Sequence, residues 1–150
     1  MPCHSEVKRL PYTSVQMYSL VADVARYPEF LPWTSAARIR SRQPTQSGEI
    51  LEADLVISFK VFRERFGSRV TLLPGLNKIL TEYIDGPFKH LHSVWSFHDL
   101  PTGGCEVAFD VDFEFKNAIL AGIIGLVFNE AMSRVVRAFE ARAQKLYSNP

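Results

Sequence analysis

The chain has 150 residues, the length of a single domain, and we expect one domain over residues 1–150. Hydrophobic residues make up 47% of it and charged residues 22%, which is typical of a folded protein and excludes a disordered one. The formal net charge of +1 excludes a strongly basic nucleic-acid module, so no DNA partner is expected. Two cysteines, Cys3 and Cys105, cannot build a disulfide framework, which favours a reduced, cytoplasmic setting.

Residues 1–9 lack the apolar core of a signal peptide. The longest uncharged run, 117–129, has thirteen residues, whereas a spanning helix needs about 20. No segment is therefore expected to cross a membrane.

The N-terminal part begins with a strand over residues 5–10, which Pro11 ends. Thr13 and Gln16 have the spacing of a capping box, in which each side chain bonds the other residue's backbone N–H. Apolar residues at helical spacing follow, and this helix is expected to end before Pro28. The segment 27–33 contains two prolines and predicts a rigid turn or a broken short helix.

From residue 36 to residue 116 apolar and polar residues alternate, most clearly over 105–115. Turn residues interrupt the alternation at 46–48, 74–77, 85–87 and 101–104. Short turns between long alternating strands predict an antiparallel meander of six strands. Arg38, Arg40 and Arg42 occupy the outward positions of one strand and Arg63, Arg65 and Arg69 those of another. Because the Glu52/Asp54 strand lies between them, a face of mixed charge is expected.

The last segment, 117–147, predicts a long helix with one apolar stripe, formed by Leu120, Ile124, Val127 or Phe128, Ala131, Val135, Phe139, Ala143 and Leu146. The order is thus strand, helix, six strands and long helix. A sheet with one apolar face must cover that face, and the long helix is the element able to do so. The expected class is α+β, with a curved antiparallel sheet of about seven strands around the helix.

The inward positions of the strands carry many aromatic residues, namely Phe59, Phe62, Phe66, Trp95, Phe97, Phe109, Phe113 and Phe115. These rings either pack together or line an apolar cavity of the kind that holds small molecules. Glu64 occupies an inward position of its strand, as these aromatic residues do. A carboxylate that faces an apolar interior is energetically costly unless it is paired. It is either returned to solvent by a bulge or strand end, or it is a polar anchor inside a pocket.

Several motifs resemble the coenzyme Q-binding branch of the START/polyketide-cyclase superfamily. They are Tyr27-Pro28-x-Phe30-Leu31-Pro32-Trp33, then Gly86-Pro87-Phe88-x-x-Leu91-x-x-x-Trp95-x-Phe97, Phe113-x-Phe115, and a C-terminal set of Met132, Ala138, Phe139, Arg142, Ala143, Leu146 and Tyr147. The chain departs from the family pattern at Thr34, where Cys is frequent, and at Ser93, where Gly is frequent. The resemblance implies a helix-grip fold that encloses an apolar tunnel.

The resemblance also implies non-catalytic binding of ubiquinone or another polyprenyl lipid, held as a ligand rather than a cofactor, in support of respiration. The residues expected to line the tunnel are Phe30, Trp33, Leu55, Ile57, Phe59, Phe62, Glu64, Phe66, Tyr83, Ser93, Trp95, Phe109, Phe113, Leu120, Ile124 and Phe128. Ser93, Thr81, Tyr83 or the Trp95 N–H would serve a head group. Gly122, Ile123, Gly125 and Leu126 are expected to form a gate that opens at a membrane surface, because interior glycines weaken a helix. The localisation expected is cytoplasmic, with peripheral contact to the inner membrane.

Two other functions stay open at this point. Some bacterial relatives in this superfamily are described as ribosome-association toxins that block subunit association, and the outward arginines are the feature that suits phosphates. The superfamily also holds polyketide cyclases and aromatases, for which Glu64 and a tyrosine would supply acid–base groups. No catalytic triad or metal site is expected, since His90, His92 and His98 all share the outward phase of one strand.

Overall fold

The computed structural model describes residues 3–59 and 62–147. Over these residues the chain forms two α-helices, two short 3₁₀ helices and seven strands. In chain order they are β1 (Cys3–Leu10), α1 (Ser14–Ala22), η1 (Val24–Glu29), β2 (Thr34–Pro44), β3 (Glu49–Phe59), β4 (Phe62–Leu73), η2 (Pro74–Leu76), β5 (Lys78–Asp85), β6 (Phe88–Asp99), β7 (Cys105–Phe115) and α2 (Ala118–Tyr147).

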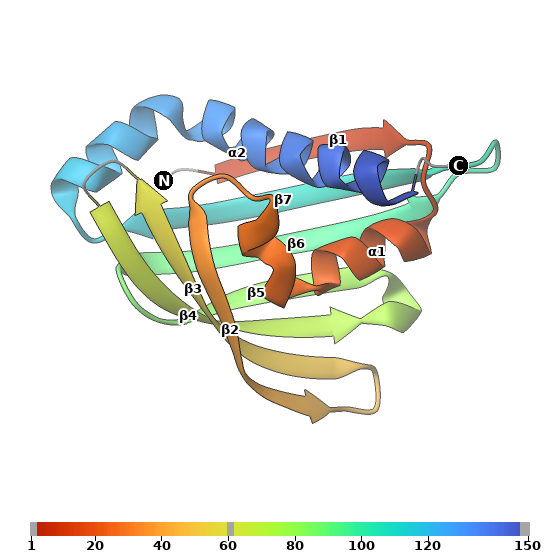
Figure 1. Cartoon of the computed structure of the whole chain (residues 1–150), viewed down its shortest axis with the longest axis horizontal. Helices are drawn as coiled ribbons and strands as arrows, with labels where there is room; N and C mark the ends of the chain where they lie inside the picture. The colour runs from red at the N-terminus through yellow and green to blue at the C-terminus, as the bar shows by residue number, and fades with distance from the viewer. Residues whose placement is uncertain (1–2, 60–61, 148–150) are drawn as a thin grey trace.

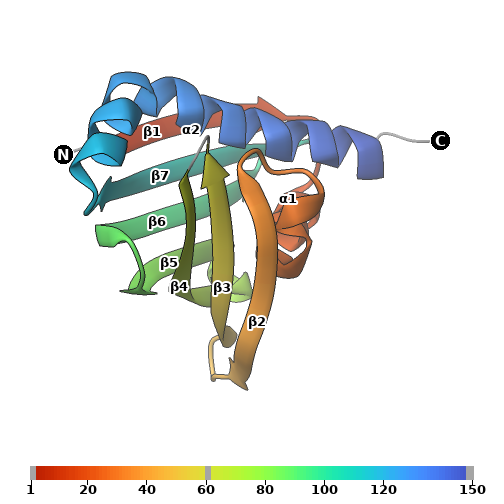
Figure 2. The same cartoon turned by 60° about the vertical axis from the view of Figure 1, so that its left-hand side comes forward.

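All seven strands belong to one antiparallel sheet with the order β1-β7-β6-β5-β4-β3-β2. Strands β2 to β7 are therefore the predicted meander, and β1 joins its far side next to β7. The sheet curls strongly, so that β1, β7 and β6 run roughly along α2 while β4, β3 and β2 rise toward it crosswise (Figures 1 and 2). The predicted α+β arrangement of a curved sheet around a long C-terminal helix is confirmed.

The N-terminal helix shows both the strength and the limit of local sequence signals. The capping box is present, with the Gln16 N–H donating to Thr13 Oγ1 at 3.1 Å and the Thr13 N–H donating to Gln16 Oε1 at 2.9 Å. This helix ends before Pro28, as predicted: α1 ends at Ala22, and Asp23 leaves the helical region with φ −85° and ψ 67°. Pro28 lies inside η1, where the φ that its ring fixes matches a 3₁₀ helix.

The segment after η1 turns sharply into β2. Trp33 has a φ of +62°, in the left-handed region that bulky residues seldom adopt. The indole packs edge-on against Phe59, with ring centroids 6.1 Å apart. This turn places Trp33 between the start of β2 and the end of β3, which matters for the site below.

The core lies between the concave face of the sheet and the two α-helices. Its larger cluster includes Met17 and Val21 of α1, Trp95 and Phe109 of the sheet, and Phe139 of α2. A second cluster gathers near the start of α2 and consists of Phe66, Phe88, Phe115 and Leu120. The two clusters are separated by partly buried residues rather than by a continuous packed layer, and the site lies there.

Helix α2 is divided at Val127, whose φ of −124° and ψ of 15° are not helical. The polar side-chain contacts that bring α2 to other described elements all come from residues after this kink. Lys8 Nζ lies 2.6 Å from Glu140 Oε1, Arg142 Nη2 lies 2.6 Å from Glu29 Oε1, and the Tyr147 hydroxyl donates to the Gln16 carbonyl at 3.2 Å. The C-terminal part is thus fastened at several points, and the first turns are held mainly by buried Leu120.

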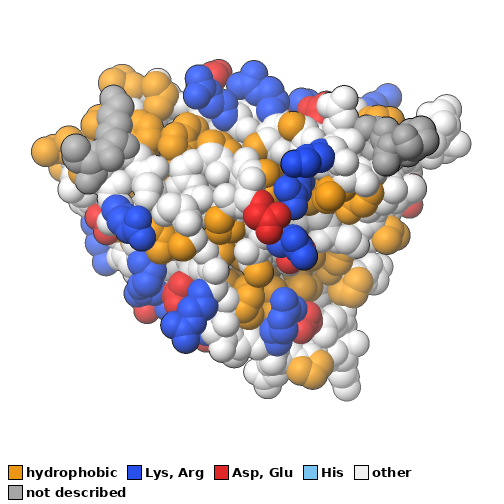
Figure 3. Space-filling model, viewed as in Figure 1, with side chains coloured by type: hydrophobic (Ala, Val, Ile, Leu, Met, Phe, Trp, Pro, Cys, Tyr) orange, Lys and Arg blue, Asp and Glu red, His pale blue; other side chains and the backbone are white. Residues whose placement is uncertain are grey.

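The face of mixed charge predicted for the arginine-bearing strands is present. Asp54 on β3 receives Arg65 Nη1 from β4 and Arg40 Nη2 from β2, each at 2.5 Å, and Arg69 Nη2 lies 3.3 Å from Glu52. Figure 3 shows Lys/Arg and Asp/Glu side chains interspersed over the visible part of the molecule. Arg38 is exposed and forms no ion pair with a described residue.

Candidate functional site

A cavity of about 240 Å³ lies between the concave face of the sheet and the part of α2 from Leu120 to Phe139. Strands β2 to β7, the η1–β2 segment and α2 all contribute to its wall. The predicted lining residues that the structure brings together here are Trp33, Leu55, Ile57, Phe59, Phe62, Glu64, Phe66, Ser93, Trp95, Phe109, Phe113, Leu120 and Ile124. The prediction that these side chains share one apolar space therefore agrees with the structure, and their role in ligand binding stays a prediction.

Three predicted lining residues lie outside the wall. Phe30 packs edge-on against Phe139, with centroids 5.2 Å apart, and Arg142 covers its other side. The Tyr83 hydroxyl accepts from the Phe88 N–H at 3.2 Å, so it is not turned toward the cavity as a head-group donor. Phe128 is buried against Phe113 with centroids 5.0 Å apart. All three side chains pack against residues that line the cavity and do not line it themselves. The sequence pattern alone does not distinguish these two kinds of position.

Other wall residues were missed by the sequence analysis although a signal for them existed. Ser68 and Val70 continue the inward phase of Phe66 along β4, and both line the cavity. Val127, which helical spacing placed in the apolar stripe of α2, also lines the cavity. Strand phase therefore predicts Ser68 and Val70 as wall residues, and helical spacing predicts Val127.

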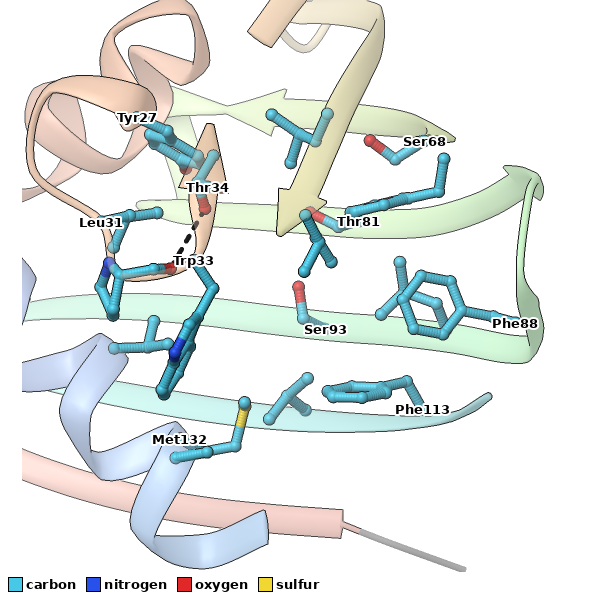
Figure 4. A pocket seen from close by; sticks show the side chains of 18 of the residues that line it. Tyr27, Leu31, Trp33, Thr34, Ser68, Thr81, Phe88, Ser93, Phe113 and Met132 are labelled. Atoms are coloured by element: carbon cyan, nitrogen blue, oxygen red, sulfur yellow. Dashed lines mark hydrogen bonds between the residues drawn. The ribbon is translucent and has the colours of Figure 1, made fainter. Parts of the chain in front are cut away.

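The polar groups of the wall are few and most are hydroxyls. Ser68, Thr81 and Ser93 project into the space between the strands and α2, as Figure 4 shows. Glu64 keeps the inward phase because the β3–β4 register runs without a shift past its partner Ile57, so the bulge that would return it to solvent is not there. Tyr27 is different, since its hydroxyl donates to the Val21 carbonyl, and burial, with Asp23 nearby, raises the pKa of the phenol.

Burial grades from one end of the cavity to the other. Ser68, Val70, Trp95 and Phe109 are almost completely buried, and they form the floor on the middle strands. Trp33, Phe59, Phe62 and Glu64 are half-buried, and Val127 is 43% exposed. The rim is therefore formed by the Trp33 turn, the ends of β3 and β4, and the kink of α2.

An exposed apolar surface adjoins this rim. Ile119, Leu126 and Val127 of α2 are 69%, 88% and 43% exposed. Figure 3 shows hydrophobic side chains gathered where α2 begins. The gate residues Gly122, Ile123, Gly125 and Leu126 lie on this stretch but outside the wall, and added Cβ atoms at Gly122 or Gly125 would meet nothing within 4 Å. These glycines are thus not needed for close packing.

Helix α2 is long and apolar enough to span a bilayer by length and composition, and only 22% of its most apolar stretch is buried. The helix is longer than the uncharged run 117–129 because it continues past the charged residues Glu130 and Arg134. Core helices of soluble domains can be equally long and apolar.

The histidines of β6 keep to the outer face. His92 and His98 are exposed, and His90 Nε2 lies 2.7 Å from Asp112 Oδ1. Within residues 3–59 and 62–147, no group of three His, Cys, Asp or Glu side chains has a geometry that would hold a metal ion.

The cavity, the curved sheet and the helix are features of a known family. Residues 10–140 match the family described as polyketide cyclase/dehydrase and lipid transport. The chain belongs to this family. It is 36% identical to the ribosome association toxin RatA of Pseudomonas aeruginosa over 92% of both chains. It is also 33% identical to the mitochondrial coenzyme Q-binding protein COQ10 homolog B of Xenopus laevis, over 96% of this chain and 59% of that protein.

Solved structures of other proteins have the same helix-grip fold. A START superfamily protein from Mycobacterium smegmatis superposes with a TM-score of 0.80 at 20% identity, covering 96% of this chain and 98% of that one. The ZhuI aromatase/cyclase of a Streptomyces species also gives a TM-score of 0.80, at 15% identity, covering 96% of this chain and 94% of that one. At these identities the likeness shows the fold alone.

Proposed function

We propose that the protein binds ubiquinone or another polyprenyl lipid in this cavity without chemically changing it, and so supports respiratory electron transport. The observation that carries the proposal is the wall itself, in which aromatic and aliphatic side chains surround a space of about 240 Å³. Each buried CH₂ of an isoprenoid contributes about 0.8 kcal/mol, so such a wall binds a lipid without any reactive group. The 33% identity to a coenzyme Q-binding protein supports this choice of ligand.

The cyclase alternative has less support from the wall. Acid–base work on a polyketide needs a proton donor beside Glu64. Tyr27 is the tyrosine in the wall, but its hydroxyl is committed to the Val21 carbonyl and burial raises its pKa, so it holds its proton tightly. A carrier that leaves its ligand unchanged needs neither group.

The binding test uses the two tryptophans of the chain, because Trp33 and Trp95 both line the cavity. A short-tailed ubiquinone is expected to quench their fluorescence saturably, and native mass spectrometry of the purified protein is expected to show a co-purified quinone. Ala131→Phe, which places a ring in the wall, should abolish quenching, whereas Ala141→Phe on the exposed side of α2 should not. No quenching of the wild type and no extracted lipid would end the proposal.

The same proposal includes a membrane contact at the exposed part of α2. Leu126 and Val127 adjoin the rim, so the surface that touches the cytoplasmic face of the inner membrane is next to the opening. Because Gly122 and Gly125 each cost a helix about 0.5–1 kcal/mol relative to Ala, the first turns can move apart from the sheet to admit a tail.

Liposome flotation tests this contact. Ile123→Asp and Leu126→Asp are each expected to lose membrane recovery while keeping the wild-type circular dichroism spectrum. Leu76→Asp, at a 66% exposed position in the distant η2 turn, serves as the matched control. Unchanged recovery of both α2 variants would remove the membrane gate while leaving the lipid site intact.

A second candidate function is association with a ribosomal subunit, which the 36% identity to RatA favours. On the strand faces four of the six arginines are paired, with Asp54, Glu52 or Glu49, but Arg38 and Arg63 are exposed and form no ion pair with a described residue. Salt-dependent co-sedimentation with purified subunits should then be lost in Arg38→Glu/Arg63→Glu. Equal sedimentation of wild type and variant would exclude these arginines as the contact.

A further inference from the structure

Three hydroxyl side chains form a row across the floor of the cavity. Ser68 and Ser93 are 1% and 8% exposed, and Thr81 lies between their strands. Within the described part of the chain, none of the three hydroxyls makes a hydrogen bond to a protein group. Their oxygens open onto the cavity, and a molecule that fills the cavity without offering them a hydrogen bond leaves each at a cost of about 1–3 kcal/mol. The wall therefore favours a molecule that supplies these partners over a purely apolar one.

The sheet register places these hydroxyls close together. Thr81 on β5 lies directly opposite Ser93 on β6, and Ser68 on β4 is two residues before Val70, the partner of Thr81. Directly opposite side chains on one face of a sheet are about 5 Å apart and diagonal ones about 7–8 Å. The row is therefore short enough for the oxygens of one compact head group to reach more than one hydroxyl.

The charge of the wall restricts that head group further. Among the described residues of the wall, Glu64 is the one charged side chain, and Lys and Arg are absent from it. Glu64 stands at the rim, and no described residue forms an ion pair with it. An anionic head would pass this carboxylate and then lose its hydration without meeting a cation, which is costly. Neutral oxygens, in contrast, match hydroxyls that both donate and accept.

The volume of the cavity determines which end of a lipid lies inside it. A cavity of about 150 Å³ holds one benzene ring, so the present cavity of about 240 Å³ holds a ring-sized head and only a short piece of tail. A long polyprenyl chain must leave through the rim. There it meets Val127 and the exposed apolar surface of α2, whereas its head meets the hydroxyl row.

We infer that Ser68, Thr81 and Ser93 form a head-group subsite that takes an uncharged head bearing carbonyl or hydroxyl oxygens, inserted first, and that Glu64 excludes anionic lipids. This inference rests on the proposed lipid-binding function and goes beyond it. It assigns the polar subsite, the orientation of the ligand and the residue that sets selectivity.

The test measures displacement of the neutral fluorescent probe N-phenylnaphthylamine by three competitors: a short-tailed ubiquinone, squalene and oleate. Squalene is an isoprenoid without oxygen, so it reports the apolar wall alone. Ser68→Ala and Ser93→Ala are each expected to weaken the quinone about fivefold, the effect of one neutral hydrogen bond, and to leave squalene unchanged. Ser96→Ala, on the same strand but outside the wall, is the matched control.

Glu64→Gln tests the charge. It is expected to strengthen oleate binding severalfold with no change for the quinone, while Glu82→Gln, at an exposed position of β5, changes neither. The inference is overturned if the serine variants weaken quinone and squalene equally, if they weaken neither, or if Glu64→Gln leaves the ratio of oleate to quinone affinity unchanged. A wild-type protein that binds none of the competitors would instead refute the proposed function.

Discussion

Phe139 holds the fastened part of α2 against the sheet, and truncating it is the sharpest test of this packing. The side chain is 3% exposed. Its ring lies edge-on to Tyr27, Phe30 and Trp95, with centroid distances of 5.4, 5.2 and 5.0 Å. A buried Phe→Ala change costs about 3–5 kcal/mol. Because Phe139 also borders the existing cavity, part of the space it vacates joins a void already there, and we expect about 3 kcal/mol.

Urea unfolding followed by far-UV circular dichroism measures this loss. With a denaturant slope of about 2 kcal/mol/M, Phe139→Ala should lower the midpoint by about 1.5 M without changing the slope. Leu146→Ala is the control on the same helix, because Leu146 is 47% exposed and should change the free energy of unfolding by no more than about 0.5 kcal/mol. A midpoint shift no larger for Phe139→Ala than for Leu146→Ala would refute the account of how α2 is anchored.

Three further predictions concern single groups. Burial raises the pKa of the Cys105 thiol to about 11, so iodoacetamide at pH 8 should modify only the exposed Cys3 in the folded protein and both thiols in urea, as counted by mass spectrometry; a doubly labelled folded protein would contradict this. The hydrogen bond from Arg40 lowers the pKa of Asp54, so this carboxylate stabilises the fold above its unfolded pKa of about 3.9 and loses that contribution as the pH falls through the folded pKa. In Asp54→Asn the free energy of unfolding should therefore fall less steeply as the pH is lowered. A pH dependence below pH 4 that equals that of the wild type would count against a stabilising role of the ion pairs around Asp54. Gly86 has a φ of +136°, and a Cβ there would lie 2.7 Å from a Cβ of β4, so Gly86→Ala should lower Tm by about 5 °C while Gly75→Ala, with nothing within 4 Å, should not.

The strand phases were the part of the fold that sequence predicted best. The alternation of apolar and polar residues predicted that Phe66, Trp95 and Phe109 lie on the same face of the sheet before any register was known. A strand with one face in water and the other in the core can place its apolar residues in no other way. Local chemistry likewise predicted the capping box at Thr13. Pro28 correctly predicted that α1 ends before it. It did not locate the end at Ala22, because a proline restricts only its immediate neighbours.

The lining of the cavity was harder to predict, because it depends on distances between elements that no local sequence pattern encodes. Phe30 and Phe128 share the apolar character of the wall, yet they pack behind it because of how α2 crosses the sheet. The hydroxyl row depends on the register that sets Thr81 opposite Ser93, which follows from turn lengths along three strands. Helical spacing placed Val127 in the apolar stripe, whereas the backbone kink at this residue has no local pattern that predicts it.

The position of β2 at the open border of the sheet has a consequence for solubility. A free border offers unpaired backbone groups on which another chain can assemble. Here the register shifts twice, at Thr34/Ala36 and at Ile39/Ser41, and the strand ends on Pro44, which has no N–H to donate. Arg38 and Arg42 also project from this strand, and together these features disfavour the addition of a strand from another copy of the chain at this border.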